Sequence, residues 1–451
     1  MSAFHAYDIR GVWGRDLDAD TAWRVGRCLP KLLGASRVLV GRDARLSSPE
    51  LSAALVRGIL EAGADVDDVG LCTTPTTYFL TGMHGYAAAA MVTASHNPPE
   101  YNGIKISKTD ALPVGGDSGL RELEAMTAAP LPPKAERPGT LRPLDPRDEL
   151  LKWFGARAPD LAGLRFVVDC SNGVGALLAR DVLGGCGGEA LFINETLDGS
   201  FPAHQPNPLL PEATEQLGDE VRRVGADLGL MFDGDADRVA FVDSSGRFVR
   251  PDLVTAIVAE PFLEAEPGAP ILCDVRTSRG VTERIAELGG VPHLWKVGHA
   301  FAKPKLRELG APFGGELAGH YYFREFCNCD SAMRAAQIVL GAAAAAKRRG
   351  GSFDSVVRSV DRYASTGELN FTVERKDDAL SAFSAWARSM NPPPRRVLDF
   401  DGLRCEWDDW WISVRKSNTE PYLRLILEAD GEELLADRRA AAEKILTPFL
   451  G

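Results

Sequence analysis

The sequence lacks the segments that place a protein in a membrane or carry it across one. A membrane-spanning helix needs about 20 consecutive apolar residues, and no run in this chain of 451 residues reaches that length. The first residues, MSAFHAYDIRG, contain neither the basic nor the apolar stretch of a secretory signal. We therefore expect a cytoplasmic protein that has no membrane as a partner.

Paired cysteines and an excess of positive charge are also missing. The eight cysteines are scattered singly apart from Cys327 and Cys329, and none forms a C-x-x-C pair. We expect reduced thiols and no zinc site. The 51 lysines and arginines are outnumbered by 63 acidic residues, for a net charge of −12. Nucleic acid is therefore not expected as a partner, and a ligand that carries phosphate must be held by local basic residues.

Three common nucleotide-binding and hydrolase motifs are absent. The segment NGVGALLA supplies Gly173 and Gly175 of a dinucleotide-binding fingerprint, but Leu178 occupies the place of its third glycine. No G-x-x-x-x-G-K-[ST] phosphate loop occurs. Ser95 has no G-x-S-x-G frame, and we do not expect the adjacent Ser95 and His96 to form a hydrogen bond as nucleophile and base.

One local plan occurs three times: an apolar strand pattern that ends in aspartate, a polar turn, and then a helical pattern. The three segments are RVLVGRD at 37–43, RFVVDC at 165–170 and PILCDVR at 270–276. Continuous apolar runs of this length are typical of buried strands, and the repeated strand–turn–helix order favours α/β domains. At about 150 residues per domain, the chain has room for roughly three to four domains.

Proline-rich and turn-forming segments divide the chain. The stretch APLPPKAERPGTLRP at 129–143 is typical of a linker. A second break follows the expected hairpin VAFVDSSGRFV at 239–249. A helix is predicted in the alanine-rich segment that follows Asp330, and a third break falls beyond it, near 362–378. We therefore expect domains at residues 1–145, 146–250, 251–366 and 367–451, of which the last is a small α+β domain.

Three aspartates at alternate positions form the strongest chemical signal. Asp233, Asp235 and Asp237 lie in GLMFDGDADRVAFVD, between two strand patterns, where alternate side chains share a face. Clustered carboxylates raise one another's pKa unless a cation neutralises them, and an all-oxygen set suits Mg²⁺ first and Mn²⁺ second. An acidic turn in water is the alternative. A calcium EF-hand loop fits badly, because Arg238 stands where its glycine is required. Arg238 instead adds a fixed cation that phosphoryl chemistry can use.

The stretch TASHNPPEYNGIK, residues 93–105, emerges directly from the apolar run YAAAAMV. It brings Ser95, His96 and Lys105 close together in sequence. Either this turn only ends a strand, or it presents Ser95 for chemistry, and these residues alone do not decide between the two.

Two further loops carry polar groups. VRKSNTEPYLRL, at 414–425, places a guanidinium, a hydroxyl and an amide in a short turn, which suits a phosphate cradle; a capping turn between strands would look similar. GGELAGHYYF, at 314–323, places Glu316 and His320 on a glycine-rich loop, where they can grip sugar hydroxyls or shuttle protons, or serve only as structure. YDIRG and VGHAFAK add Arg10 and His299.

In order along the chain, these stretches resemble the α-D-phosphohexomutase superfamily, in its phosphomannomutase/phosphoglucomutase branch. The resemblance rests on YDIRG, GRDARLSSP, TASHNPPEYNGIK, DGDADR, VGHAFAK, GGELAGH and RKSNTEP. It implies four domains around a central cleft: three similar α/β domains with mixed sheets and a smaller C-terminal α+β domain. It also answers the question of the serine turn, because Ser95 resembles the serine that carries the phosphoryl group.

The resemblance implies a role for each site residue. Ser95, Asp233, Asp235 and Asp237 would hold one Mg²⁺ ion. The other catalytic positions that it implies are Arg10, Lys105, Arg238, His299 and His320. The substrate-binding positions that it implies are Tyr7, His96, Arg276, Glu316, Arg415, Ser417, Asn418 and Thr419.

The implied reaction interconverts hexose 6-phosphate and hexose 1-phosphate, of mannose and/or glucose. It passes through phospho-Ser95 and a hexose 1,6-bisphosphate, which also serves as activator. Two positions depart from the pattern of relatives: Ala318 replaces a serine in the sugar-binding loop, and Arg276 stands where some dual-specificity relatives have lysine, which favours mannose. A phosphoglucosamine mutase and an inactive sugar-phosphate-binding protein are the alternatives. Hexose phosphates are the expected partners, and monomer and homodimer both stay open.

Overall fold

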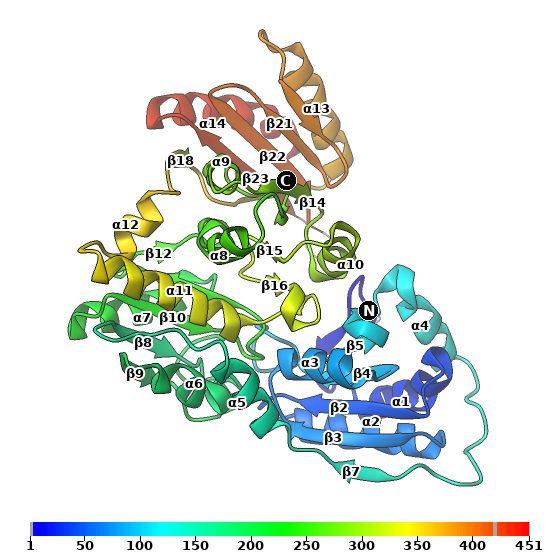
Figure 1. The fold of residues 1–451 in the computed structure, drawn as a ribbon. Coiled ribbons are helices and arrows are strands. Elements are labelled where there is room, and N and C mark those ends of the chain that lie inside the picture. The colour runs from blue at the N-terminus through cyan, green and yellow to red at the C-terminus, as the bar shows by residue number, and fades with distance from the viewer. Residues whose placement is uncertain (1–2, 418–421, 451) are drawn as a thin grey trace.

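In the computed structural model, residues 3–417 and 422–450 are described, and they form four β-sheets with helices packed against them. Figure 1 shows the four units: the first lies at the lower right, the second at the lower left, the third in the middle above these two, and the fourth at the top. Among the described residues, no helix has the length and apolar character needed to cross a membrane. The predicted fold class of three α/β domains and a smaller α+β domain is confirmed.

The first sheet is mixed and has the order β1-β5-β4-β2-β3-β7, with β6 paired to β5. Its strands are β1 (Ile9–Val12), β2 (Arg37–Arg42), β3 (Asp65–Leu71), β4 (Ala88–Val92), β5 (Tyr101–Lys108), β6 (Leu112–Pro113) and β7 (Leu141–Pro143). Its helices are α1 (Ala19–Leu33), α2 (Ser48–Glu61), α3 (Thr74–His84) and α4 (Leu120–Ala128). The end of the predicted linker thus forms β7, which pairs in parallel with β3 at the sheet edge.

The second and third sheets share one plan, in which parallel strands are extended by antiparallel ones. The second has the order β12-β11-β10-β8-β9 and the third β14-β13-β15-β16-β17. Their strands are β8 (Arg165–Asp169), β9 (Glu189–Ile193), β10 (Leu228–Phe232), β11 (Val239–Val242), β12 (Phe248–Val249), β13 (Pro270–Asp274), β14 (Val291–Trp295), β15 (Phe313–Gly315), β16 (Tyr321–Phe323) and β17 (Cys329–Asp330). Their helices are α5 (Arg147–Gly155), α6 (Ala176–Leu183), α7 (Pro211–Val224), α8 (Pro251–Ala265), α9 (Arg279–Glu287), α10 (His299–Leu309), α11 (Ala332–Arg348) and α12 (Phe353–Arg358).

The three repeated strand patterns become β2, β8 and β13, each inside its sheet. These strands are buried along nearly their whole length, as continuous apolar runs require. The predicted hairpin forms β11 and β12, and the predicted alanine-rich helix forms α11. Helix ends follow simple capping rules: Asp18 accepts a hydrogen bond from the Thr21 amide at the start of α1, and Gly34, with φ of 63°, ends it.

The fourth sheet is antiparallel within the described residues and has the order β18-β23-β22-β21-β20, with β19 paired to β23. Its strands are β18 (Ala364–Ser365), β19 (Leu369–Thr372), β20 (Arg396–Leu398), β21 (Leu403–Glu406), β22 (Trp410–Lys416) and β23 (Tyr422–Ala429). The helices α13 (Lys376–Ser389) and α14 (Glu432–Leu446) pack beside it.

One apolar cluster joins parts of the first three domains, whereas most of the core of the first domain and the core of the fourth are separate clusters. Phe79 of the first domain, Phe154 of the second and Phe326 of the third belong to the same buried cluster. The fourth domain meets the third partly through polar contacts: Arg404 donates hydrogen bonds to the carbonyls of Val275 and Thr277 at 2.8 and 2.7 Å. The rings of Trp295 and Phe400 also lie 5.5 Å apart between centroids. A partly polar junction of this kind is typical of domains that move relative to each other.

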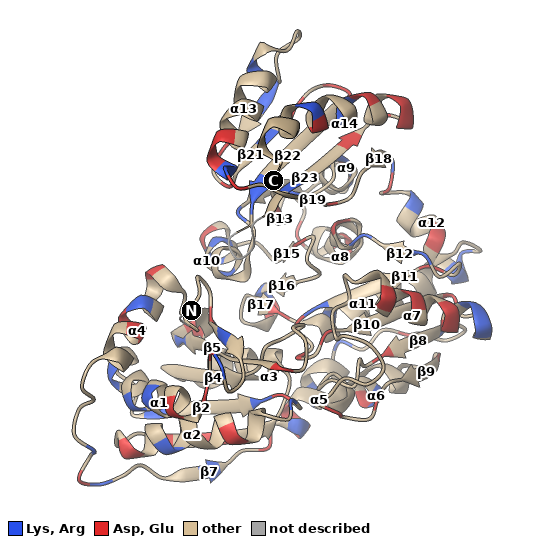
Figure 2. Ribbon diagram, turned by 180° about the vertical axis from the view of Figure 1, so that it is seen from behind, with Lys and Arg blue, Asp and Glu red and all other residues tan. Residues whose placement is uncertain are grey.

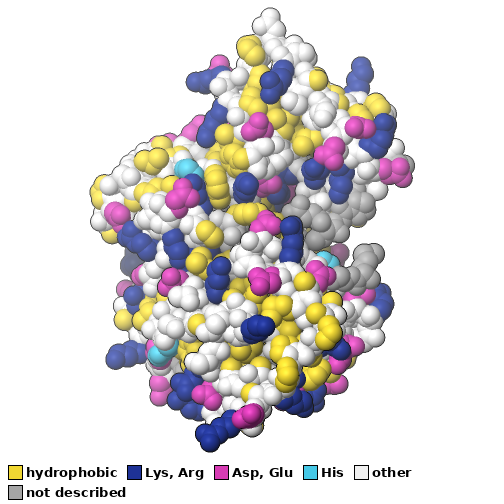
Figure 3. All heavy atoms as spheres, turned by 90° about the vertical axis from the view of Figure 1, so that its right-hand side faces the viewer, with side chains coloured by type: hydrophobic (Ala, Val, Ile, Leu, Met, Phe, Trp, Pro, Cys, Tyr) yellow, Lys and Arg dark blue, Asp and Glu magenta, His cyan; other side chains and the backbone are white. Residues whose placement is uncertain are grey.

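Along the helices of all four domains, acidic and basic residues are interspersed (Figure 2). On the face seen in Figure 3, hydrophobic groups at the surface are likewise mixed with acidic and basic side chains.

Candidate active site

The serine turn is held in place by a buried arginine. Beyond β4, Ser95 adopts a φ of 52° and is 1% exposed. The fully buried Arg45 donates hydrogen bonds of 2.7–3.0 Å to the carbonyls of Ser95, Asn97, Pro98 and Tyr101. Charge-assisted hydrogen bonds to several carbonyls of one loop fix its backbone. Sequence reasoning missed Arg45, although it lies in the quoted GRDARLSSP motif.

The three aspartates lie on the loop between β10 and β11 and are all buried. One carboxylate oxygen from each of Asp233, Asp235 and Asp237 lies within 4.8 Å of the others. A Cβ on Gly234 would approach the carbonyl oxygen of Ser95 to 2.6 Å. Glycine at this position therefore lets the aspartate loop and the serine turn touch.

The first and second domains meet at these two loops. The Ser95 hydroxyl donates a hydrogen bond to Asp233 Oδ2 at 2.9 Å. The Thr74 hydroxyl, at the start of α3, donates to Asp235 Oδ2 at 2.5 Å, and the Thr74 amide donates to the Asp235 carbonyl at 3.0 Å. The serine and the acidic triad are thus adjacent, as the resemblance implied.

Two cations balance the triad. Lys105 on β5 places its ammonium 2.7 Å from Asp235 Oδ2 and 2.6 Å from Asp237 Oδ2. Arg238 Nε lies 4.0 Å from carboxylate oxygens of Asp233 and Asp237. Burial raises the pKa of Asp233 well above its usual value, and the neighbouring Asp237 and Asp235 add to this. Burial also favours a raised pKa at Asp237, but Lys105, His320 and Arg238 together outweigh it and lower the pKa.

These residues fit a divalent cation. Within the described part of the chain, Asp235 Oδ1 and Asp237 Oδ1 are buried and have no hydrogen-bond partner. Unsatisfied buried carboxylate oxygens are costly, and hard cations such as Mg²⁺ prefer oxygen ligands. The donor set that the sequence predicted is therefore capable of holding one ion.

The structure corrects one expectation about the serine. Ser95 Oγ and His96 Nδ1 lie 3.1 Å apart, within hydrogen-bonding distance, although we expected these neighbours not to pair. The left-handed backbone of Ser95 makes this possible, because it differs from the extended form in which successive side chains point to opposite faces. Desolvation and the nearby Arg238 and Arg10 cations hold the pKa of His96 well below its usual value.

Arg10 and Lys105 lie on neighbouring strands behind the serine turn. Arg10 on β1 donates to Asn97 Oδ1 at 2.7 Å and also pairs with Asp8. It therefore holds a side chain of the turn whose backbone carbonyls Arg45 binds. Tyr7, three residues earlier, has its ring 6.2 Å from the ring of His299 on α10, measured between centroids.

The third domain brings His320 to the acidic loop. The backbone amide of Val239 donates to the Gly319 carbonyl at 3.2 Å, and Arg238 Nε donates to His320 Nε2 at 3.0 Å. The His299 ring centroid lies 6.3 Å from that of His320, and burial together with Lys303 lowers the pKa of His299 to about 3. These residues thus form one group with the serine and the triad.

Glu316 of the predicted sugar loop and Arg415 of the predicted phosphate cradle form a second group near the fourth domain. Glu316 accepts a hydrogen bond from the Gly298 amide at 2.9 Å, and burial raises its pKa. Arg415 on β22 binds both oxygens of Asp401 at 2.9 Å, and Asp401 also accepts from the Val297 amide. The backbone amides of residues 297 and 298 therefore link Asp401, the partner of Arg415, to Glu316. Ser417 is buried, and Asn418 and Thr419 lie outside the described residues.

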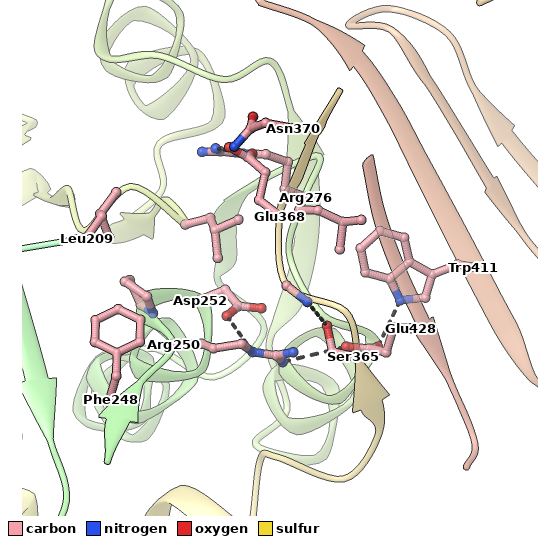
Figure 4. A pocket seen from close by; sticks show the side chains of 14 residues that line it. Leu209, Phe248, Arg250, Asp252, Arg276, Ser365, Glu368, Asn370, Trp411 and Glu428 are labelled. Carbon is pink, nitrogen blue, oxygen red and sulfur yellow. Dashed lines mark hydrogen bonds and ion pairs between the residues drawn. The ribbon is translucent and has the colours of Figure 1, made fainter. Parts of the chain in front are cut away.

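Arg276 lines a pocket of about 330 Å³ where the second, third and fourth domains meet (Figure 4). It is buried, binds Asp274 at 2.8 Å and reaches Glu368 of the fourth domain at 3.2 Å. Leu317 of the sugar loop and Trp411 of β22 line the same pocket. Arg276 therefore lies at the junction that any movement of the fourth domain would alter.

Comparison with known proteins gives the same order of units along the chain. Profiles of the phosphoglucomutase/phosphomannomutase family match the chain as α/β/α domain I at residues 1–130, domain II at 149–246, domain III at 250–363 and the C-terminal domain at 368–445. The chain belongs to this family.

Individual members of the phosphoglucomutase/phosphomannomutase family resemble it over nearly their whole length. A phosphomannomutase of Escherichia coli K12 is 36% identical over 449 residues, with 97% of each chain covered. A protein of Xanthomonas campestris pv. campestris named "phosphohexose mutases" is 36% identical over 445 residues, with 97% of each covered. A crystal structure of a family protein from Burkholderia thailandensis has a TM-score of 0.90 and 33% identity, and the match covers 99% of this chain and 97% of that one. The chain is thus an enzyme of the mutase kind.

Proposed function

We propose that this enzyme interconverts the 6-phosphate and the 1-phosphate of a hexose, mannose and/or glucose, through phosphorylated Ser95 and a hexose 1,6-bisphosphate. The observation that carries the proposal is the 2.9 Å hydrogen bond from Ser95 Oγ to Asp233 Oδ2. It places a nucleophilic hydroxyl against a buried acidic triad that Lys105 and Arg238 already approach. The name of the Escherichia coli relative supports a mannose phosphate as one substrate.

In the first step, the phosphoryl group leaves Ser95 Oγ for the free hydroxyl of the hexose monophosphate. The Oγ–P bond breaks, a sugar O–P bond forms, and the hydroxyl proton passes to a base. His320 suits that role because its Nε2 is a hydrogen-bond acceptor, whereas Lys105 and Arg10 are donors in all their observed contacts. After the sugar turns end for end, its other phosphoryl group passes to Ser95 Oγ: that sugar O–P bond breaks, the Oγ–P bond forms again, and the sugar oxygen takes the proton back from the base.

Asp233, Asp235 and Asp237, with an oxygen of phosphorylated Ser95, are the groups proposed to hold one Mg²⁺. When bound, the ion supplies Lewis-acid stabilisation of charge on the phosphoryl oxygens. Arg238 and Lys105 lie beside the same carboxylates and add fixed positive charge. A hexose 1,6-bisphosphate is the proposed activator, because it can phosphorylate Ser95 that has lost its phosphoryl group.

The phosphate that does not react is held by Arg415 and Ser417, with Asn418 and Thr419 assigned by resemblance. Glu316 grips sugar hydroxyls, Tyr7 and His96 line the cleft, and Arg276 favours mannose. Ala318 supplies no hydroxyl, so the sugar loop makes fewer polar contacts than a serine would allow.

The four domains are proposed to divide at residues 145, 250 and 366, and the fourth is proposed to close over the cleft when substrate binds. Its separate apolar core supports this, since movement need not break a shared core. Closure excludes water from phospho-Ser95. Small-angle scattering with and without a hexose bisphosphate tests this step, and an unchanged radius of gyration contradicts it.

Coupled assays with mannose 1-phosphate, glucose 1-phosphate and glucosamine 1-phosphate, each with the matching bisphosphate, test the function. We expect turnover of mannose and/or glucose phosphate, none by Ser95→Ala, and one added phosphoryl group on Ser95 in the intact mass. Turnover of glucosamine phosphate alone indicates a phosphoglucosamine mutase. No turnover of any of the three overturns the proposal.

A further inference from the structure

Behind His320 lies a buried ion pair that the proposed chemistry does not yet use. Lys303 on α10 is 0% exposed, Asp330 at the end of β17 is 1% exposed and His320 is 4% exposed. Lys303 Nζ lies 2.8 Å from Asp330 Oδ1, and His320 Nδ1 lies 2.9 Å from Asp330 Oδ2. Each oxygen of this carboxylate therefore has one partner of its own.

The lysine is held in place from a second side. Its ammonium lies 3.2 Å above the ring centroid of Tyr78, on α3 of the first domain, and a desolvated cation over an aromatic face is stabilised. Isolated buried charges are costly, so a buried lysine and aspartate persist only as a pair. Lys303 thus keeps the carboxylate ionised and restricts which way its two oxygens face.

These contacts determine which nitrogen of His320 carries the proton. A neutral imidazole has one N–H donor and one acceptor. Asp330 can only accept, so His320 Nδ1 carries the hydrogen. Arg238 Nε can only donate, so His320 Nε2, at 3.0 Å, presents its lone pair. Both neighbours therefore favour the same tautomer.

The cluster of Asp237, His320 and Asp330 has the spacing of a possible second metal site. Lys303 already neutralises Asp330, and Arg238 and Lys105 already lie beside His320 and Asp237. The trio therefore fits the orientation of an imidazole better than it fits a second ion.

We propose that Lys303 and Asp330 are positioning residues that keep His320 protonated on Nδ1, so that Nε2 keeps the lone pair that accepts from Arg238 in the resting enzyme and takes the proton of the sugar hydroxyl when the substrate replaces that contact. The proposal rests on the proposed function in its use of His320 as the base. The orientation of His320 itself does not depend on that function, and it can be measured in the resting enzyme.

Lys303 gives a sharp expectation for Asp330→Asn. The Lys303 ammonium can only donate hydrogen bonds, so the introduced asparagine must turn its carbonyl oxygen, rather than its NH₂ group, toward it. Its NH₂ group then faces His320 Nδ1, which has to accept, so the imidazole proton moves to Nε2 and the hydrogen bond from Arg238 to that nitrogen is lost. The base is lost although the volume of the side chain is unchanged. We expect kcat to fall by about 10²-fold or more, the range that general-base catalysis contributes, with little change in KM.

The double variant D330N/K303M separates orientation from simple damage. Without the ammonium, the amide of the introduced asparagine can rotate and accept from Nδ1, so we expect the original tautomer to return and kcat to recover at least tenfold relative to Asp330→Asn. The matched control is Glu325→Gln. Glu325 lies in the same segment and binds Arg157 and Arg334 at 2.9 and 2.8 Å, away from His320. We expect it to leave both the tautomer and kcat unchanged.

The tautomer is read by long-range ¹⁵N–¹H NMR of protein labelled at its seven histidines, with the His320 signals assigned by their loss in His320→Asn. The proposal is supported if His320 is protonated on Nδ1 in the wild type and on Nε2 in Asp330→Asn. Wild-type His320 protonated on Nε2, or Asp330→Asn with the wild-type tautomer and kcat, overturns it. If D330N/K303M fails to fold, the two other spectra still decide. If no hexose phosphate is turned over, the proposed function fails, while the spectra still test the positioning.

Discussion

Gly234 is the position where one added methyl group most directly tests the proposed contact between the serine turn and the acidic loop. A Cβ there would lie 2.6 Å from the Ser95 carbonyl oxygen, whereas carbon–oxygen contacts between backbones settle at about 3.3 Å or more. The two loops must therefore separate by about 0.7 Å in Gly234→Ala. Arg45 holds that carbonyl at 2.8 Å, so the serine turn cannot yield freely.

A misplacement of about 1 Å can cost about 10²-fold in rate, so we expect kcat for the mutase reaction of Gly234→Ala to fall by one to two orders of magnitude. The assay is the coupled mannose or glucose phosphate assay, with circular dichroism to verify folding. Gly155→Ala is the matched control: Gly155 ends α5, is exposed, and has no atom within 4 Å of an added Cβ. Wild-type kcat in a correctly folded Gly234→Ala would refute the reasoning that this close approach positions Ser95.

Three further predictions concern stability and metal binding. Arg45→Met leaves the buried Asp43 without its ion-pair partner and four carbonyls without their donor, so the free energy of unfolding should fall by about 3–5 kcal/mol. Thermal denaturation measures this, with the exposed Arg57→Met on α2 as the control. Equal melting temperatures for wild type and Arg45→Met would contradict the prediction. Burial lowers the pKa of His204, but the hydrogen bond to Asp169, the negative charge of Asp169 and the hydrogen bond to the Gln205 carbonyl together outweigh this and raise the pKa above its usual value. His204 thus stabilises the fold fully below about pH 6.5, and this contribution is lost as the pH rises through the raised pKa. The stability difference between wild type and His204→Asn should therefore shrink from pH 6 to above that pKa, and a difference that does not depend on pH would contradict this. Mg²⁺ should raise the melting temperature of wild type by binding the folded state, and Asp235→Asn should abolish the shift; the same shift in both would argue against the triad as the metal site.

Local sequence was sufficient where the structure is decided by residues near each other in the chain. The strands at 37–43, 165–170 and 270–276 were predictable because each is a continuous apolar run that ends in aspartate. The convergence of Asp233, Asp235 and Asp237 was predictable for a similar reason, since alternate residues between two strands share a face. The ordered motifs also implied that Ser95 and this triad meet.

Only the tertiary structure decided how the site is held together. Arg45 braces a turn about fifty residues away, and the Ser95–Asp233 hydrogen bond joins residues 138 positions apart. Lys303, Asp330 and His320 lie on three separate elements, and their pairing depends on how α10 packs against the third sheet. Apolar periodicity reports which face of one element is buried, but it carries no information on which charged group of a distant element lies opposite. That pairing is set by the packing of whole domains, and it is what places the proposed base and nucleophile beside the proposed metal ligands.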